Sequence, residues 1–354
     1  MSYTNGLDNP SLYFNTKLYT GNGSTQSITG VGFQPDFTWI KDRTTSNSHY
    51  SANSIMGANI SLPTNGTNAE ITNNAYGYMT SFDSDGFSLT NGASGSETVN
   101  FSGDNYASWN WLASNTTASN TDGSITSTVS ANTTSGFSIV SYTGTGSSGA
   151  TIGHGLGVAP KMIIAKNRSI ASNWLVYNYS MSANGDYALF LDSSSAKDNS
   201  QDYWGDTTPT SSVFTVGSRQ EANGSGNNII AYCFAEKKGF SKFGSWIGNG
   251  STDGTFVYTG FKPSFIIGKN TSRIEDWFML DNKRDTFNPV DERLQPNSNG
   301  AEVTVTTLGI DFCSNGFKLR GATNQYNASG ETMIYMAFAE SPLVGTNNIP
   351  ATAR

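Results

Sequence analysis

The chain has 354 residues, of which 13% are charged and 12% are aromatic, and its formal net charge is −7. This balance argues against a nucleic-acid-binding protein, which usually carries a basic face. The sequence also has no apolar run long enough to span a membrane. Abundant Gly, Ser, Thr and Asn, together with many aromatic residues, favour strands joined by tight turns over helices.

The first 16 residues precede any repeated pattern and carry apolar side chains such as Leu12, Tyr13 and Phe14. We expect residues 1–16 to form an arm that docks on the rest of the chain or on a neighbouring chain. The alternative is a frayed terminus. This segment shows no secretion signal, which predicts synthesis and assembly in a cytoplasm.

One sequence block recurs three times along the chain, at residues 19–24, 142–147 and 246–251. Each copy leads to a proline and, six positions later, to a lysine. The prolines are Pro35, Pro160 and Pro263, and the lysines are Lys41, Lys166 and Lys269. Because about 100 residues can bury a core of their own, the pattern predicts three copies of one β-rich module.

Turn signals and apolar stretches place the strands within each copy. A strand is expected at 37–41, directly after Pro35, and Asp85-Gly86 predicts a hairpin that recurs at 312–319. Similar spacing from the prolines makes Trp109, Tyr232 and Phe338 equivalent core residues.

The predicted fold class is all-β, with three tandem antiparallel β-sandwich modules that are jelly-roll-like. The predicted organisation is an N-terminal docking arm at 1–16, module 1 at 17–114, a Ser/Thr/Asn-rich linker at 115–136, module 2 at 137–238, module 3 at 239–342 and a C-terminal tail at 343–354.

Catalytic patterns are absent from the sequence. The only two histidines, His49 and His154, stand at unmatched positions of different copies, which argues against zinc sites and histidine-based triads. A Gly-x-Gly-x-x-Gly match at 144–149 is followed by residues that cannot form the helix of a dinucleotide site. We therefore expect no catalytic residue, no metal and no cofactor.

Aromatic residues that break the repeat are the candidates for ligand binding, because loops on a rigid scaffold often carry recognition. The candidate residues are Tyr203 and Trp204, the flanking carboxylates Asp202 and Asp206, and the pair Tyr76 and Tyr78. The alternative is that these aromatics pack within their own module. The acidic loop around Trp204 is also where a paired-carboxylate hydrolase would be sought.

Several blocks of the sequence resemble a repeated β-rich domain of unknown function that occurs in tail-fibre-like and other virion structural proteins of marine bacteriophages. The matching blocks are 19–43, 81–89, 158–168 and 337–342. The resemblance covers about 17–342 and implies a virion location, with assembly in the host cytoplasm.

The resemblance implies a bacteriophage virion structural protein, most simply a tail fibre or tail-tip component that contacts the host surface and binds glycans weakly. The alternative is a purely architectural capsid decoration, head-fibre or collar protein, and a polysaccharide depolymerase is a third reading. The expected partners are other virion proteins and host surface glycans, and phage fibres suggest a homotrimer.

Overall fold

Antiparallel strands form almost all of the regular structure. The computed structural model describes residues 6–346 and 350–352, and all its paired strands run antiparallel. In this part of the chain the helical elements are only a short turn of 3-10 helix at Pro10–Leu12, α1 (Gln220–Asn223) and α2 (Asn324–Asn327). The predicted all-β class is confirmed. None of these helices could cross a lipid bilayer.

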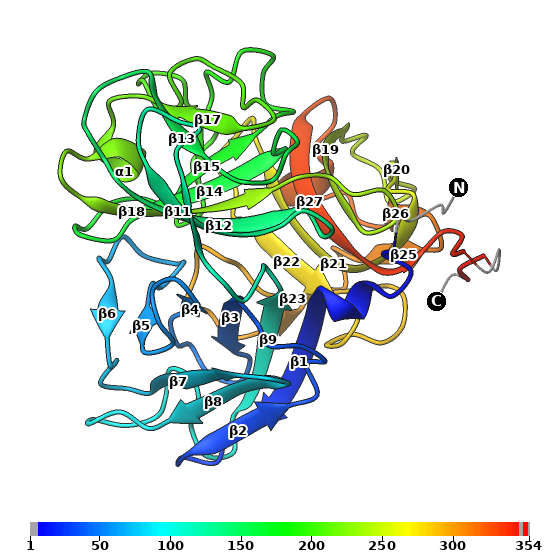
Figure 1. The fold of residues 1–354 in the computed structure, drawn as a ribbon. Coiled ribbons are helices and arrows are strands. Elements are labelled where there is room, and N and C mark those ends of the chain that lie inside the picture. Colours follow the sequence, from blue (N-terminus) through cyan, green and yellow to red (C-terminus); the bar gives the residue numbers. More distant parts are fainter. Residues whose placement is uncertain (1–5, 347–349, 353–354) are drawn as a thin grey trace.

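The first repeat contains a four-stranded sheet in the order β1-β9-β3-β4 and a three-stranded sheet in the order β2-β8-β7 (Figure 1). A two-stranded ribbon, β5-β6, extends from the connection between β4 and β7. The bounds are β1 (Phe14–Thr20), β2 (Gln26–Thr29), β3 (Phe37–Asp42), β4 (Tyr50–Asn53), β5 (Ile60–Ser61), β6 (Ile71–Thr72), β7 (Tyr78–Asp83), β8 (Gly86–Thr90) and β9 (Asn105–Trp111).

The second repeat contains a seven-stranded sheet in the order β10-β11-β12-β18-β14-β15-β16 and the pair β13-β17. The bounds are β10 (Ala118–Asn120), β11 (Ser127–Asn132), β12 (Phe137–Thr143), β13 (Ala150–Gly153), β14 (Met162–Asn167), β15 (Leu175–Asn178), β16 (Leu189–Phe190), β17 (Val213–Val216) and β18 (Asn228–Phe234).

The third repeat returns to the pattern of the first, with sheets β19-β27-β21-β22 and β20-β26-β25 and a ribbon β23-β24. The bounds are β19 (Ser241–Ile247), β20 (Phe256–Tyr258), β21 (Phe261–Asn270), β22 (Phe278–Asp281), β23 (Glu292–Arg293), β24 (Val303–Thr304), β25 (Ile310–Cys313), β26 (Gly316–Leu319) and β27 (Thr332–Pro342).

The repeated prolines do not all stand at strand entries. Pro35 and Pro160 precede β3 and β14, as expected, but Pro263 lies inside β21. The pairing of β21 with β27 shifts on both sides of Pro263. A bulge tolerates a residue that cannot donate a ladder hydrogen bond.

The large sheets of the three repeats meet at a central cluster of aromatic rings. Trp111 of β9, Phe234 of β18 and Phe338 of β27 occupy equivalent register positions. Their ring centroids lie 6.5 Å (Trp111–Phe234), 5.8 Å (Trp111–Phe338) and 6.2 Å (Phe234–Phe338) apart. One hydrophobic cluster therefore draws on the large sheets of all three repeats.

Each large sheet turns its other face to the smaller sheet of its own repeat, with a separate apolar cluster between the two. In the first repeat this cluster joins Ile40 and Tyr106 of the large sheet to Ile28, Met79 and Phe87 of the small one. The second and third repeats have corresponding clusters.

Neighbouring repeats are also joined by three equivalent hydrogen bonds, in which a ring N–H eight residues after each repeated lysine reaches a backbone carbonyl of another repeat. The three bonds are Trp174 Nε1 to Pro63 O (3.0 Å), Trp277 Nε1 to Phe190 O (2.9 Å) and His49 Nε2 to Gln295 O (3.0 Å). They link the first repeat to the second, the second to the third and the third back to the first, so the contacts close a circle.

The range 115–136, which the sequence predicts as a linker, contains β10 and β11. β11 pairs with β12 along its whole length, and Ile125 and Val129 are buried. The pairing with β12 and these two buried side chains fix the segment to the edge of the second sheet.

The two terminal ranges are only partly described. Of the predicted arm, 1–5 lie outside the described residues, while Phe14 opens β1 and is buried in the shared cluster. Of the predicted tail, 347–349 and 353–354 lie outside them, and the backbone N–H of Ala351 donates to Leu343 O at 2.8 Å.

Candidate functional site

The predicted loop aromatics Tyr203 and Trp204 are core residues, which corrects their assignment to a ligand-binding surface. Both are buried in the apolar cluster of the second repeat. The Tyr203 hydroxyl donates to Asp198 Oδ2 at 2.6 Å, and the Trp204 ring packs edge-on against Tyr177 at a centroid distance of 5.9 Å. Buried rings cannot offer a face to a ligand.

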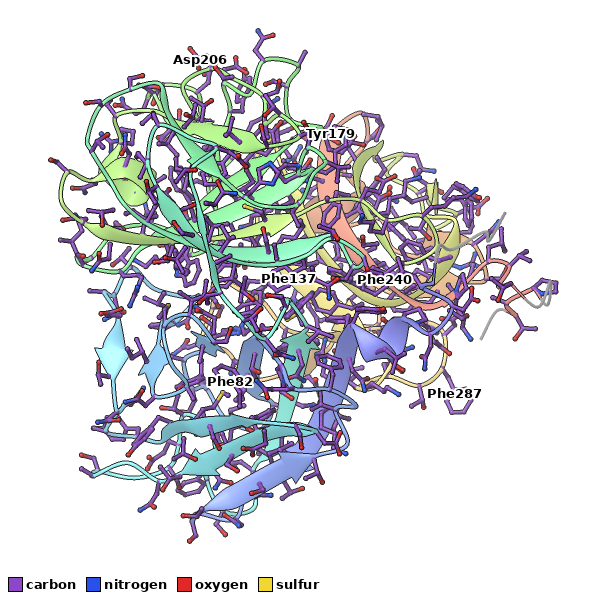
Figure 2. The ribbon with its side chains drawn as sticks, viewed as in Figure 1. Phe82, Phe137, Tyr179, Asp206, Phe240 and Phe287 are labelled. Carbon is purple, nitrogen blue, oxygen red and sulfur yellow. The ribbon has the colours of Figure 1, made fainter. Side chains whose placement is uncertain are left out.

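The flanking carboxylates shape the same turn. Asp202 accepts the backbone N–H of Gly205 through Oδ1 (3.1 Å) and that of Ser218 through Oδ2 (3.0 Å). Asp206 has a positive φ of 46° and lies at the outer surface of the second repeat (Figure 2). The structure thus gives Asp202 a local role in holding the turn.

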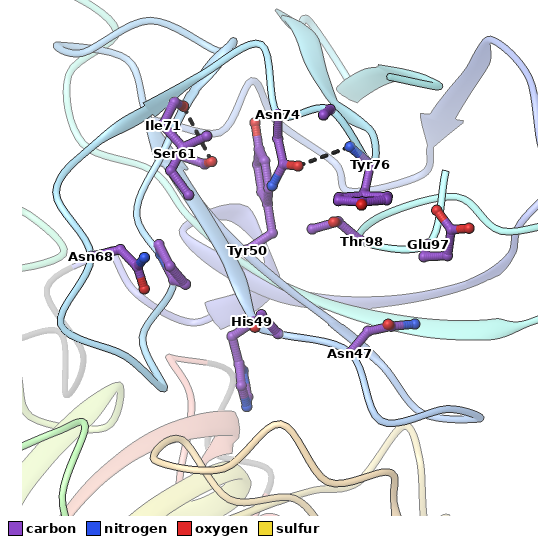
Figure 3. Close-up of a pocket in the computed structure, with 13 residues that line it drawn as sticks. Asn47, His49, Tyr50, Ser61, Asn68, Ile71, Asn74, Tyr76, Glu97 and Thr98 are labelled. Carbon is purple, nitrogen blue, oxygen red and sulfur yellow. Dashed lines mark hydrogen bonds between the residues drawn. The ribbon is translucent and has the colours of Figure 1, made fainter. Parts of the chain in front are cut away.

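Tyr76 lines a surface groove of about 580 Å³ in the first repeat (Figure 3). Its side chain is 52% exposed. Tyr78, the other predicted residue of this pair, begins β7 and packs against the apolar cluster of the repeat. The polar residues that line the groove beside Tyr76 include Asn47, Asn68, Asn74, Glu97 and Thr98.

Backbone hydrogen bonds hold Tyr76 in place at the groove. Asn74 Oδ1 accepts the Tyr76 N–H at 2.9 Å, and the Thr98 N–H donates to Tyr76 O at 2.9 Å. Gly77 follows with a φ of 102°, a backbone conformation that side chains rarely adopt. The tyrosine ring is therefore presented on a turn whose backbone is hydrogen-bonded on both sides of the ring.

Beneath the groove, Tyr50 and His49 belong to a buried hydrogen-bonded layer. The Tyr50 hydroxyl donates to Ala58 O (2.8 Å) and accepts the Met79 N–H (3.1 Å), and burial raises the pKa of Tyr50. These contacts leave the phenol as a fixed neutral group.

His49 is held as a neutral ring. Trp39 Nε1 can only donate, so His49 Nδ1 accepts its hydrogen bond (2.8 Å), and Nε2 carries the proton that is donated to Gln295 O. Burial, with the nearby Lys41 charge, lowers the pKa of His49 to about 3. A ring with this pKa and both nitrogens engaged is a structural tie between repeats.

The three repeated lysines are fully buried, one in the large sheet of each repeat. Burial lowers the pKa of each to about 8. Their ammonium groups donate to backbone carbonyls, from Lys41 to Asp42 O (2.7 Å), from Lys166 to Ser172 O (2.6 Å) and from Lys269 to Asn270 O (2.6 Å). The lysines therefore hold the loops that follow their strands.

The sequence selected Tyr76 as a candidate but did not indicate the walls of the groove beside it, which come from three separate stretches of the chain. It also missed that His49 is the counterpart of Trp174 and Trp277. The signal was available, because each stands eight residues after its repeated lysine. Among the described residues, no three His, Cys, Asp or Glu side chains gather closely enough to hold a metal ion.

Comparison with known proteins identifies one family. A family model described as a domain of unknown function, DUF7483, matches residues 9–342. No curated protein and no solved structure matches the chain. Because the matched range contains all three repeats with their shared core, the chain belongs to the DUF7483 family.

Proposed function

We propose that the chain is a bacteriophage virion structural protein, a tail-fibre or tail-tip component that contacts glycans on the host surface. The observation that carries the proposal is the groove at Tyr76, where an exposed aromatic ring on a hydrogen-bonded turn stands among amide, hydroxyl and carboxylate groups. The resemblance of the sequence blocks to phage virion proteins supports the same function.

The chemistry of the groove suits a sugar. The apolar face of a pyranose ring can stack on Tyr76, while Asn74, Glu97 and Thr98 offer partners for its hydroxyl groups. Binding sites combine an apolar surface with a few placed polar groups in this way. A single open site of this kind binds weakly, and a homotrimer would gain avidity by presenting three copies.

We further propose that each repeat is a β-sandwich module, jelly-roll-like, and that the three modules are packed around the central aromatic cluster. Each repeat has a large and a small sheet with its own apolar cluster between them, which supports this classification. Packed sheets of this kind suit a binding protein, because they restrain the loops that carry the binding surface.

The test is adsorption of the purified, fluorescently labelled protein to host cells and to a glycan array. We expect glycan-dependent binding that competes with phage adsorption, and Tyr76→Ala should weaken it by about fivefold because an aromatic stacking contact is worth about 1 kcal/mol. The control is Phe287→Ala, which removes an aromatic side chain that is even more exposed, on a loop of the third repeat. Absence of adsorption, or equal binding by Tyr76→Ala, would refute host contact through this groove.

The alternative is a purely architectural role as a capsid decoration, head-fibre or collar protein. One observation favours it, an exposed apolar sheet edge in the third repeat that suits contact with another protein. Antibody labelling of phage particles in the electron microscope separates the two, since signal on the head would exclude a tail component.

A further inference from the structure

Strands β1, β12 and β19 are equivalent in the three large sheets, and the repeats differ in what lies against the outer side of each. In the second repeat, β11 pairs with the outer side of β12. In the first, β1 is an edge strand, and the ammonium group of Lys17 reaches the end of β2, where a Cβ added at Gly30 would lie 2.9 Å from it. In the third, β19 is an edge strand, and no further strand pairs with its outer side in the described part of the chain.

The third repeat has apolar residues at this edge where the first has polar ones. The strand registers make Ile247, Phe256 and Tyr258 the counterparts of Thr20, Ser27 and Thr29. The three apolar side chains are 54%, 44% and 50% exposed, respectively. Natural edge strands are usually blunted by charge or covered, so an apolar edge marks a place of contact.

A groove of about 530 Å³ runs along this edge, between β19 and β20. Gly244 stands in it where the first repeat has Lys17, and the buried rings of Trp246 and Tyr335 also line it. The Tyr335 ring lies against Gly244, where an added Cβ would come within 2.9 Å of it, so this ring forms part of the groove wall.

Two tyrosines at the rim of the groove are each covered by a lysine. Lys242 Nζ lies 5.3 Å from the ring centroid of Tyr258, and Lys161 Nζ lies 4.3 Å from that of Tyr179. Tyr179 belongs to the second repeat and lies where that repeat faces the third (Figure 2). Such cation–π contacts favour the observed positions of the two rings at the rim.

The length of the connections explains why the third repeat lacks its own cover. Residues 112–136 connect β9 to β12 and supply β11, whereas only 235–240 connect β18 to β19. Six residues cannot leave the sheet, form a covering strand and return. The third edge can be covered only by a segment from elsewhere.

We propose that β19 and its groove receive an extended strand from a partner polypeptide, in the place that β11 occupies on β12. The strand runs antiparallel to β19, carries aliphatic side chains at alternate positions that face the groove, and small polar ones between them. Residues 125–131 show a related pattern, with Ile125 and Val129 buried, Val129 opposite Val140, and small residues between and after them. Backbone hydrogen bonds supply affinity, and the groove supplies specificity. This surface is separate from the groove at Tyr76, so neither proposal depends on the other.

The test uses a display library of ten-residue peptides with aliphatic residues at alternate positions, selected on the intact protein. We expect enrichment of a consensus strand, and protection of the amides of 241–247 from hydrogen exchange when a synthetic peptide of that consensus is added. The triple variant Ile247→Thr, Phe256→Ser, Tyr258→Thr, which installs the residues of the first repeat, should bind the peptide at least tenfold more weakly.

The matched control is Ile274→Thr, Phe287→Ser, Val303→Thr, which removes three other exposed apolar side chains of the third repeat and should bind like the natural chain. Lack of enrichment, unchanged exchange of 241–247 or equal binding by the first triple variant would overturn the proposal. Dimerisation that is lost in that variant would also overturn it, because the occupant would then be a second copy of this chain.

Discussion

Replacing Phe338 by alanine should weaken all three repeats at once. Phe338 is buried, and its ring lies within 6.4 Å, between centroids, of rings from every repeat. The closest of these is Phe14 at 4.7 Å, in a stacked arrangement. Few positions in the molecule join so many aromatic neighbours, so the side chain is a sensitive probe of the shared core.

The expected loss follows from the cavity that the ring would leave. A buried Phe→Ala change costs about 3–5 kcal/mol, a large part of the 5–15 kcal/mol that typically stabilises a folded protein. With an unfolding entropy of roughly 2.1 cal/mol/K per residue, a chain of this length would lose on the order of 5 °C in Tm.

Calorimetry and hydrogen exchange provide the measurement. We expect one cooperative transition that moves to lower temperature, with faster exchange in β3 and β14 as well as in β21. Phe317→Ala is the control, since Phe317 is equally buried but lies between the two sheets of the third repeat. It should speed exchange chiefly in that repeat. Separate transitions in the natural chain, or effects of Phe338→Ala confined to the third repeat, would refute a shared core.

Two predictions concern pH. Because burial lowers the pKa of Lys41, Lys166 and Lys269 to about 8, the unfolded chain binds more protons than the folded chain between pH 8 and the ordinary lysine pKa of 10.5. Stability should therefore rise from pH 8 to pH 10, by up to about 1.4 kcal/mol per pH unit for each lysine, and Lys166→Met should reduce the slope by roughly a third. Urea unfolding at a series of pH values measures the slope, and a flat or falling curve would contradict the argument. His49 acts at the other end of the scale, because its pKa of about 3 means that stability is lost as pH falls from 6.5 towards 3. His49→Gln, which can keep both hydrogen bonds, should lose less stability over this range than the natural chain, and identical acid profiles would show that His49 is already protonated in the folded protein.

Local sequence patterns were reliable for strands and tight turns. The strand expected at 37–41 is β3, and the two hairpins expected at 82–89 and 312–319 are the pairs β7-β8 and β25-β26. Asp85-Gly86 and Asn315-Gly316 mark these turns. A Cβ on Gly86 or Gly316 would lie 1.9 Å or 2.1 Å, respectively, from a carbonyl oxygen of the adjacent strand. Such signals depend on neighbouring residues alone.

Counting residues from the repeated prolines gave a wrong equivalence in the third repeat, where the pairing of β21 with β27 has a bulge at Pro263. Trp109 and Tyr232 are equivalent, but the registers make Met336 their counterpart in the third repeat, whereas Phe338 corresponds to Trp111 and Phe234. The spacing from the prolines could not reveal this shift, because the order of pairing is a property of two strands together.

The assignment of Tyr203 and Trp204 failed for a related reason. Their turn-rich surroundings are typical of a surface loop. In the second repeat, however, the small sheet has two strands where the others have three, and these two rings fill part of the apolar cluster there. The need for a filled core, rather than the local sequence, decided their place.

The sequence by itself determined that the chain is all-β and threefold repeated, because alternation and turn chemistry act over a few residues. Only the tertiary structure decided that the repeats share one aromatic core, that His49 closes the circle of contacts, and that Tyr76 and the edge of β19 remain open. These features depend on which sheet faces meet. Apolar surfaces from distant parts of the chain come into contact only when the whole core is packed.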